Sequence, residues 1–253
     1  MNAAQLGLRQ LRFEQRIFWR TPATVFFTVA MPLTLLVIFA SINRDQRLSA
    51  VGGVRFADYF VPGMAAFGVA ATCYGNVAAR IVFRREAGLL RRARTTPLPT
   101  TSLLAGYIAN AATTSALSVT AVTITGIIFF GLPVPSHLPL LVLSVMLGAA
   151  SLSALGLAVS TYIPSIEAAD AVVFGTLLPV LFISGAFQPV ASDSIIGRIS
   201  VVLPIRHLLE LNLAAYGIVD DHKLWRHIAA LVAWGTIGAS IAARRFKWQP
   251  RAT

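Results

Sequence analysis

The chain has 253 residues, of which 56% are hydrophobic and only 12% are charged. A water-soluble domain carries about 25% charged residues, so this composition excludes an ordinary soluble fold, and lipid must surround much of the chain. The net charge of +11 suggests nucleic-acid binding. Most of the cations, however, flank long apolar runs, as juxtamembrane residues do. We therefore expect an all-α polytopic membrane protein with no nucleic-acid partner.

The segment before the first long apolar run has the pattern of an amphipathic helix. Arg9, Arg12, Arg16 and Arg20 fall within about 80° of one another on a helix, and leucine and aromatic side chains flank them. Such a helix can lie in the membrane interface with its guanidinium groups among lipid phosphates. We expect an interfacial helix over residues 5–20; the alternative is a plain positively charged anchor.

Apolar runs follow that are long enough to cross a bilayer, which takes about 20 residues. Six spans are expected, at residues 22–42, 59–80, 103–130, 138–161, 169–187 and 226–243. Pro32 is expected to kink the first span. The stretch Gly131–Pro135 is a turn between the third and the fourth.

The region 184–217 is apolar, but prolines and charges interrupt it too often for a clean span. We expect a re-entrant hairpin on the outer side, since non-spanning backbone at membrane depth is tolerated when protein buries it. Six spans leave both termini on one side. With both termini in the cytoplasm, the inner segments carry 14 cations and the outer ones 7, the bias that the positive-inside rule predicts.

The loop after the second span is the most informative segment. Two leucines lie among arginines over residues 84–98, and Pro97 ends any helix there. A short charged helix with an apolar strip, held against the membrane base, suits the docking of a soluble partner. The alternative is a positively charged loop without a partner.

This loop resembles the cytoplasmic segment of the type-2 ABC exporter permeases, and most closely that of the bacterial drug- and antibiotic-efflux (daunorubicin-type) branch. The matching residues are Glu86, Gly88, Leu89, Leu90, Arg91, Arg92, Arg94, Thr96, Pro97 and Leu98. Two further segments, Phe182–Pro189 and Leu203–His207, resemble the family's turn after the fifth span and its run before the last span. Leu89 departs from the family pattern, in which threonine is common.

The resemblance implies a permease with a cytoplasmic coupling helix over residues 84–98, in which Arg85 joins the matching residues as the contact to an ATPase. It also implies two copies of a separate ABC ATPase subunit, which would bind ATP and Mg, and a second permease subunit, identical or homologous. The chain itself would bind no cofactor. The expected location is the bacterial plasma membrane.

Absent motifs agree with that expectation. The sequence has no phosphate-binding loop of the Gly-x-x-x-x-Gly-Lys type and no zinc-protease or serine-hydrolase motif. His207, His222 and His227 lie near two aspartates, but we expect solvated histidines and no metal site. No catalytic residue is expected.

Neutral polar residues in the spans are candidates for a transport path. They are Thr72, Tyr74, Asn76, Ser184 and Gln188. The alternative for each is ordinary hydrogen bonding between helices. The expected function is efflux of drugs, antibiotics or other amphipathic compounds, with lipid or polysaccharide export as the alternative. An ion-coupled carrier is disfavoured because the spans carry almost no charge, and a membrane enzyme because no catalytic cluster is present.

Overall fold

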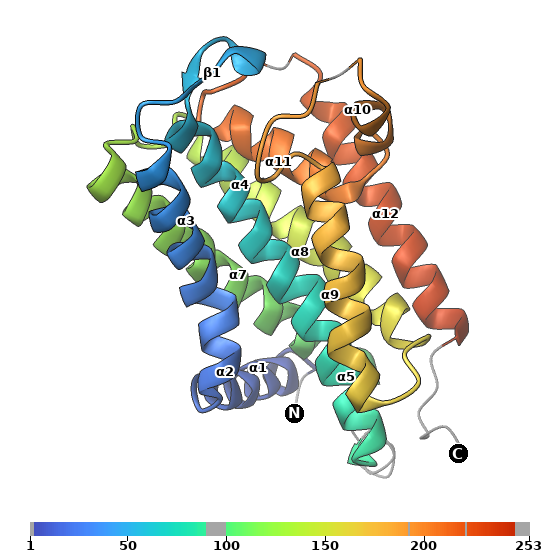
Figure 1. The fold of residues 1–253 in the computed structure, drawn as a ribbon. Coiled ribbons are helices and arrows are strands. Elements are labelled where there is room, and N and C mark those ends of the chain that lie inside the picture. The colour runs from blue at the N-terminus through green and yellow to red at the C-terminus, as the bar shows by residue number, and fades with distance from the viewer. Residues whose placement is uncertain (1–2, 90–99, 192, 221, 246–253) are drawn as a thin grey trace.

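The computed structural model describes residues 3–89, 100–191, 193–220 and 222–245 of the chain. Helices make up 79% of the described residues, and the only strands among them form a hairpin of two-residue strands, β1 (Arg47–Leu48) with β2 (Val54–Arg55). The expected all-α membrane fold is therefore confirmed at the level of its class. Figure 1 shows the long helices standing side by side, with the hairpin at one end of the bundle and helix α1 across the other.

The helices follow one another with short connections. In chain order they are α1 (Ala3–Trp19), α2 (Pro22–Val25), the π-helical turn η1 (Phe26–Ala30), α3 (Met31–Ile42), the 3-10 turn η2 (Ser49–Val51), α4 (Phe56–Ala70), the π-helical turn η3 (Ala71–Asn76), α5 (Val77–Glu86), α7 (Thr100–Phe130), α8 (Leu138–Ser160), α9 (Ile166–Ile183), α10 (Ile195–Ser200), α11 (Pro204–Ala215) and α12 (Leu224–Arg245).

Four helical segments of the described chain are long and apolar enough to cross a bilayer. They are Phe56–Glu86, Gly106–Phe130, Leu138–Ser160 and Ile166–Ile183, and they coincide with the expected second to fifth spans. The first expected span contains a shorter apolar helix, Thr28–Ile42. The sixth corresponds to α12, whose 22 residues include arginines near both ends. A multi-pass membrane protein is thus supported, while the count of six spans stays a prediction.

The first expected span is irregular just before Pro32, where a kink was predicted. A π-helical turn precedes α3, in which the N–H of Met31 bonds to the carbonyl of Phe26. Because Pro32 has no N–H, the carbonyl of Thr28 lacks its usual helical donor. The hydroxyl of Ser118 on α7 donates to that carbonyl instead, at 2.9 Å. The proline is therefore accommodated by a neighbouring helix that supplies the missing donor.

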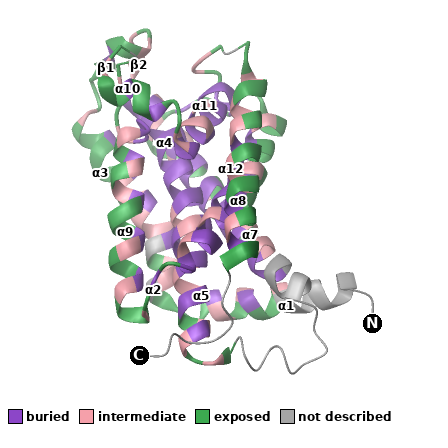
Figure 2. Ribbon diagram, turned by 90° about the vertical axis from the view of Figure 1, so that its right-hand side faces the viewer, coloured by how far each residue is buried: buried purple, intermediate pink, exposed green. Residues whose placement is uncertain are grey.

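The second span is the core of the bundle. Every α4 residue except Asp58 is buried, and Figure 2 shows this helix enclosed by the others. Exposed apolar positions lie on other helices instead: Ile128, Phe129 and Met146 each expose more than 60% of their surface. A helix that is apolar on all sides is expected at the centre of a membrane bundle, which is where the structure has it.

The described part of the region 184–217 lies at the end of the bundle remote from α1, and its re-entrant character stays a prediction. The chain leaves α9 through Gly185, whose φ of +83° favours glycine, and then forms α10 and α11. The Tyr59 hydroxyl donates to the Gly185 carbonyl at 2.7 Å. The nearby Gly63 allows close approach, because a Cβ there would lie 2.1 Å from the Ala186 carbonyl oxygen.

Candidate coupling and transport site

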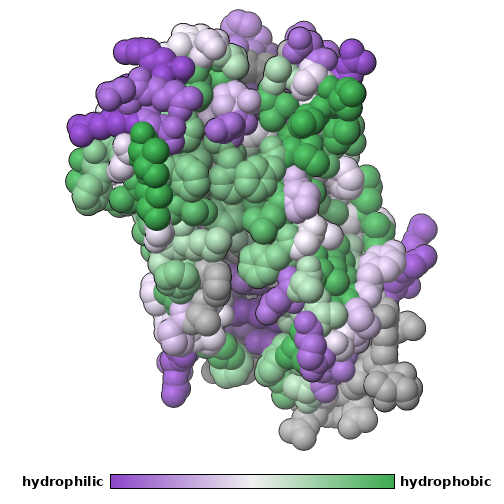
Figure 3. All heavy atoms as spheres, viewed as in Figure 1, coloured by the Kyte–Doolittle hydropathy of each residue, from purple (hydrophilic) through white to green (hydrophobic). Residues whose placement is uncertain are grey.

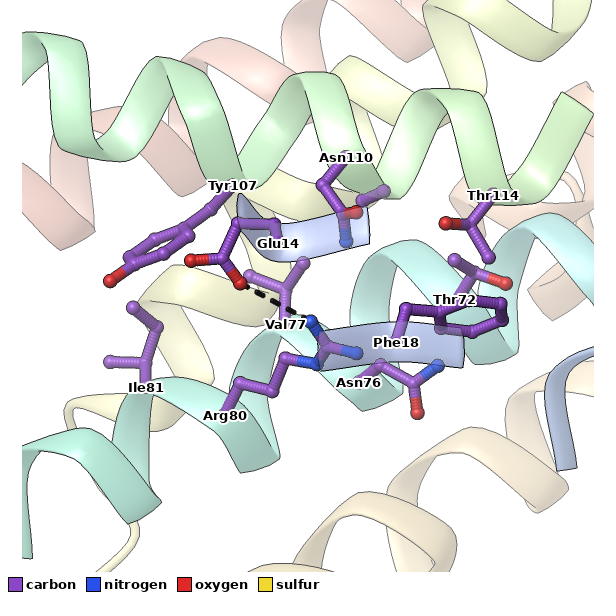
Figure 4. A pocket seen from close by; sticks show the side chains of 11 residues that line it. Glu14, Phe18, Thr72, Asn76, Val77, Arg80, Ile81, Tyr107, Asn110 and Thr114 are labelled. Atoms are coloured by element: carbon purple, nitrogen blue, oxygen red, sulfur yellow. Dashed lines mark hydrogen bonds and ion pairs between the residues drawn. The ribbon is translucent and has the colours of Figure 1, made fainter. Parts of the chain in front are cut away.

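The end of α5 is joined to α1 by a buried ion pair. The Glu14 side chain on α1 is fully buried, and Nη2 of Arg84 lies 2.8 Å from each of its carboxylate oxygens. Arg84 also donates to the Tyr107 hydroxyl on α7, and its guanidinium carbon lies 4.5 Å from the centre of that ring. Arg80, one turn earlier, reaches Glu14 at 3.4 Å, the contact drawn in Figure 4. Glu14 is therefore compensated, as a buried carboxylate must be.

The next residue along α5 makes a different connection. Arg85 is 3% exposed, and its guanidinium donates to the carbonyl oxygens of Ser160 at 3.1 Å, Ile163 at 2.8 Å and Pro164 at 3.4 Å. These carbonyls belong to the end of α8 and the turn into α9. A helix C-terminus leaves its last carbonyls without partners and carries partial negative charge. A guanidinium there donates hydrogen bonds to these carbonyls and also compensates the charge.

The two arginines reach opposite neighbours because successive helical residues point about 100° apart. Arg84 connects α5 to α1, and Arg85 connects α5 to the α8–α9 turn. Both lie in the last turn of α5, where the segment expected to contact an ATPase, residues 84–98, begins. We call Glu14, Arg84 and Arg85 the base clamp. A displacement of that loop would therefore reach α1 and α9 at once.

A cleft lies between the α1–α3 segment and α9, with α5 as its floor. It consists of two adjoining cavities of about 320 Å³ and 790 Å³. The residues that line both are Thr24, Ala79, Arg80 and Asp170. Figure 3 shows the corresponding face of the molecule, where a hollow in the lower half exposes hydrophilic residues below a hydrophobic band. The cleft therefore has mostly apolar walls and a charged middle section.

A much smaller cavity lies beside the clamp, between α1, η3–α5 and α7. Its volume of about 20 Å³ is enough for roughly one water molecule. Figure 4 shows Glu14, Arg80 and Asn110 around it. The Asn110 side-chain oxygen is buried and has no hydrogen-bond partner among the described residues. The cavity is thus polar enough to hold a water molecule bound to that oxygen.

Four of the residues predicted to couple to an ATPase lie in the described chain. Arg85 belongs to the clamp, and its Nε donates to Glu86 at 3.1 Å. Gly88 has a φ of +66° and turns the chain after α5, and the exposed Leu89 lines the larger cavity of the cleft. The others lie outside the described residues: Leu90, Arg91, Arg92, Arg94, Thr96, Pro97 and Leu98.

Three of the predicted path residues lie together in η3, but with different environments. Asn76 lines the smaller cavity of the cleft and donates to the Thr28 hydroxyl at 2.8 Å. The Tyr74 hydroxyl lies 2.6 Å from that of Thr176 on α9. Thr72 is buried and lines the water-sized cavity by the clamp. Of these three, Asn76 alone lines the cleft.

The other two predicted path residues lie at the remote end of the bundle. Ser184 is buried, with a hydroxyl that has no partner among the described residues, and Gln188 is exposed. Neither lines the cleft between the α1–α3 segment and α9. The structure therefore does not bring the five path residues into one site, and their role stays a prediction.

The sequence analysis missed Glu14, Arg80 and Asp170. One signal was available for Glu14, which is the only acidic residue before Asp45 and stands among four arginines. A lone acid in a basic segment indicates an internal ion pair. Nothing comparable marks Asp170, because its place in the cleft depends on how α9 packs.

Two of the three histidines noted in the sequence meet at the end remote from α1. The Nδ1 atoms of His207 and His227 lie 2.9 Å apart. Burial and the neighbouring imidazole lower the pKa of His207. His222 is exposed, and the described residues contain no group of three or more His, Cys, Asp or Glu side chains that could hold a metal ion.

Comparison with known proteins agrees with this arrangement. Residues 9–216 match the family described as ABC-2 type transporter, and no curated protein matches the chain. The matched region runs from α1 to the end of α11, and so includes the base clamp and the cleft. The chain belongs to the ABC-2 type transporter family and is a membrane-spanning permease subunit of an ABC transporter.

Proposed function

We propose that this permease exports drugs, antibiotics or other amphipathic compounds, driven by a separate ATPase that docks on the loop at residues 84–98. The observation that supports the proposal is that the two arginines of the base clamp bind different parts of the bundle. Arg84 binds α1 and Arg85 binds the α8–α9 turn, and these elements lead into the two walls of the cleft. The docking loop therefore begins at the turn of α5 whose side chains bind the elements leading into both walls of the cleft.

The proposed coupling step follows from that connection. When the ATPase moves the loop, the last turn of α5 moves with it. The ion pair with Glu14 transmits the movement to α1, and the hydrogen bonds of Arg85 transmit it to the start of α9. The cleft between them changes width. Rigid helices that carry a displacement over their whole length suit this role.

The lining of the cleft supports an amphipathic cargo. Met31, Phe67 and Leu177 provide apolar walls in the smaller cavity, and Arg80 and Asp170 provide charge where the two cavities meet. Export of lipid is the second candidate, because exposed Phe13 and Phe83 line the larger cavity at the surface of the bundle. A ligand could then enter sideways from the bilayer.

The assembly that we propose has two permease subunits, identical or homologous, above two ATPase subunits that bind ATP and Mg. It lies in a bacterial plasma membrane with both termini in the cytoplasm. The larger number of cations on the inner segments supports this orientation. No catalytic role is proposed for any residue of the chain.

The test is to purify the permease with its co-expressed ATPase and to measure drug efflux and ATP hydrolysis in vesicles. We expect Arg85→Ala to leave the complex intact but to reduce transport per ATP about tenfold, while Arg198→Ala on exposed α10 changes neither. Charge reversal at Arg91 and Arg92 should weaken the complex itself. Transport by the permease alone on an ion gradient would contradict the proposal.

A further inference from the structure

We infer that the cleft binds an amphiphile with a zwitterionic head group, with the cation on Asp170 and the anion on Arg80. The binding site stands on the geometry of the cleft alone. The further step, that the bound amphiphile is cargo, rests on the proposed function. The shared chemistry is that of a phosphoethanolamine head group, which a resident membrane lipid and an exported amphiphile can both carry.

Asp170 offers a carboxylate that no described residue neutralises. It is the fifth residue of α9, it is exposed, and it lines both cavities of the cleft. It makes no hydrogen bond or ion pair with any described residue. Its neighbours on the cleft wall, Val173 and Leu177, are apolar. A carboxylate beside apolar walls near lipid is costly without a counter-charge, so a cation from the ligand would be stabilised there.

Arg80 offers N–H donors from the floor of the cleft. Its side chain is 24% exposed, and its one ion pair, with Glu14, is 3.4 Å long. Glu14 is bound more closely by Arg84, at 2.8 Å. A guanidinium has five N–H donors, and the contact with Glu14 occupies one of them. Donors therefore remain for a phosphate or carboxylate in the cleft.

The two charges lie in the same cavities without joining each other. No ion pair within 4 Å connects Arg80 to Asp170, although both line each part of the cleft. Among the described side chains that line the cleft, Arg80 and Arg84 both contact Glu14, which lies outside it, and Asp170 is the one acid. A zwitterion can place a cation on Asp170 and an anion on the remaining N–H donors of Arg80 at once, whereas a ligand with a single charge can pair with only one of the two.

The remainder of the cleft suits hydrocarbon. Phe67 and Met31 line its smaller cavity, and Phe13, Ile17 and Phe83 line its larger one. A total of about 320 Å³ and 790 Å³ in the two parts lies in the range of small-molecule sites. Apolar walls around one pair of opposite charges match an amphiphile better than a polar solute.

The binding test uses the full-length permease without ATPase, in detergent, and lipids of one chain length with different head groups. The probes are fluorescent phosphatidylethanolamine, phosphatidylglycerol, diacylglycerol and an alkylammonium amphiphile. We expect phosphatidylethanolamine to bind about tenfold more tightly than any of the other three, a difference that one charge-assisted contact can supply. Equal binding of all four probes would overturn the inference.

Variants locate the site. Asp170→Asn should weaken phosphatidylethanolamine binding about tenfold and remove its advantage over phosphatidylglycerol. Glu167→Gln, an exposed acid in the same helix that lines neither cavity, should leave binding unchanged. Arg80→Lys keeps the charge near Glu14 and should weaken binding less than Arg80→Gln. Unchanged binding in Asp170→Asn would refute the assignment of that residue.

A second arm separates a resident lipid from cargo. With ATPase and ATP in vesicles, transported phosphatidylethanolamine changes leaflet, which a membrane-impermeant quencher detects, whereas a resident lipid stays in place. Movement that is lost in Asp170→Asn assigns the ligand as cargo. Binding without movement leaves the binding site standing and contradicts only the cargo step. Failure of ATPase coupling would leave the binding result untouched, so the two proposals can fail separately.

Discussion

Different kinds of contact hold the helices together at the two ends of the bundle. At the α1 end, buried ions make the connections: Glu14 with Arg84, and Arg85 with the carbonyls that end α8. At the remote end, the fully buried connections are made by neutral groups, and the partly exposed Arg55 adds a longer contact, 3.4 Å, to the Phe130 carbonyl. The buried Asn212 accepts from the Ser144 hydroxyl at 2.7 Å and donates to the Pro62 carbonyl at 3.3 Å, and glycines let backbones touch.

This difference indicates which end can move. Ion pairs and arginine–carbonyl bonds involve long side chains, which can keep contact while the helices shift. Backbone-to-backbone packing at Gly63 has no such freedom, because the atoms already approach as closely as sterics allow. We therefore expect the α1 end to respond to an ATPase and the remote end to act as a fixed hinge.

Glu14→Gln should have the largest effect, because it breaks the ionic end. The amide keeps the shape of the side chain but leaves Arg84 buried without its counter-charge. Breaking a buried ion pair in this way costs about 3–5 kcal/mol. Thermal unfolding of the purified permease in detergent measures the loss, and α1 should become accessible to protease first.

The control for Glu14→Gln is the same substitution at Glu167, which is exposed at the start of α9 and should unfold like the wild type. The double variant Glu14→Gln with Arg84→Gln should recover part of the loss, since both partners are then neutral. If Glu14→Gln unfolds like the wild type, the ion pair does not hold α1 in place.

Gly63→Ala should have the next largest effect, because it breaks the packed end. The new Cβ would lie 2.1 Å from the Ala186 carbonyl oxygen. A backbone atom cannot relieve such a clash by rotating away, as a flexible side chain can. Overpacking of this kind costs about 1–3 kcal/mol. Gly175→Ala on α9, where a Cβ meets nothing within 4 Å, should instead stabilise the helix by up to about 1 kcal/mol. Thermal unfolding of the two variants tests the contrast, and equal midpoints would contradict it.

The sequence predicts the local features of this fold but not the tertiary contacts between its helices. The apolar runs and their turns are local patterns, so the second to fifth spans were predicted at nearly their observed positions. The base clamp depends on which arginine of a basic run faces which helix. That choice is tertiary, and the pattern around Arg84 and Arg85 shows only a positive loop. A kink at Pro32 was predicted from proline chemistry, but the hydrogen-bond donor that compensates for the proline, Ser118, comes from a helix about 90 residues away.

The cleft could not be predicted from the sequence either, because it depends on how α5 packs against α9. Asn76 was identified as polar and within a span, but neither Asp170 nor Arg80 was named as a candidate residue. Their common cavity exists because Ala78 and Val82 of α5 pack against Ala169 and Val173 of α9, which brings the two charges to one face. Small apolar residues of this kind carry no sequence signal for a charged site beside them.

The smallest expected effect concerns the histidine pair, which tests whether the remote end stays fixed in acid. His207 and His227 share one hydrogen bond between Nδ1 atoms, so at least one ring must be neutral. Burial, His227 and Arg206 lower the pKa of His207 from its ordinary 6.5. The unfolded chain then binds a proton more readily than the folded one, so stability falls as the pH drops through 6.5 towards the folded pKa, and levels off below it.

Unfolding midpoints measured between pH 7.5 and pH 5 test this loss of stability. The groups around the pair decide its size. Arg206 opposes protonation of His207, while the backbone at Val201 favours it, and Arg226 precedes His227 on α12. The wild type should lose stability in acid, and the double variant His207→Gln with His227→Gln should lose less. His222→Gln, at an exposed position, should follow the wild type. If the double variant shows the full acid loss, the histidine pair is not the acid-sensitive contact, and the fixed end of the bundle must be weakened by acid elsewhere.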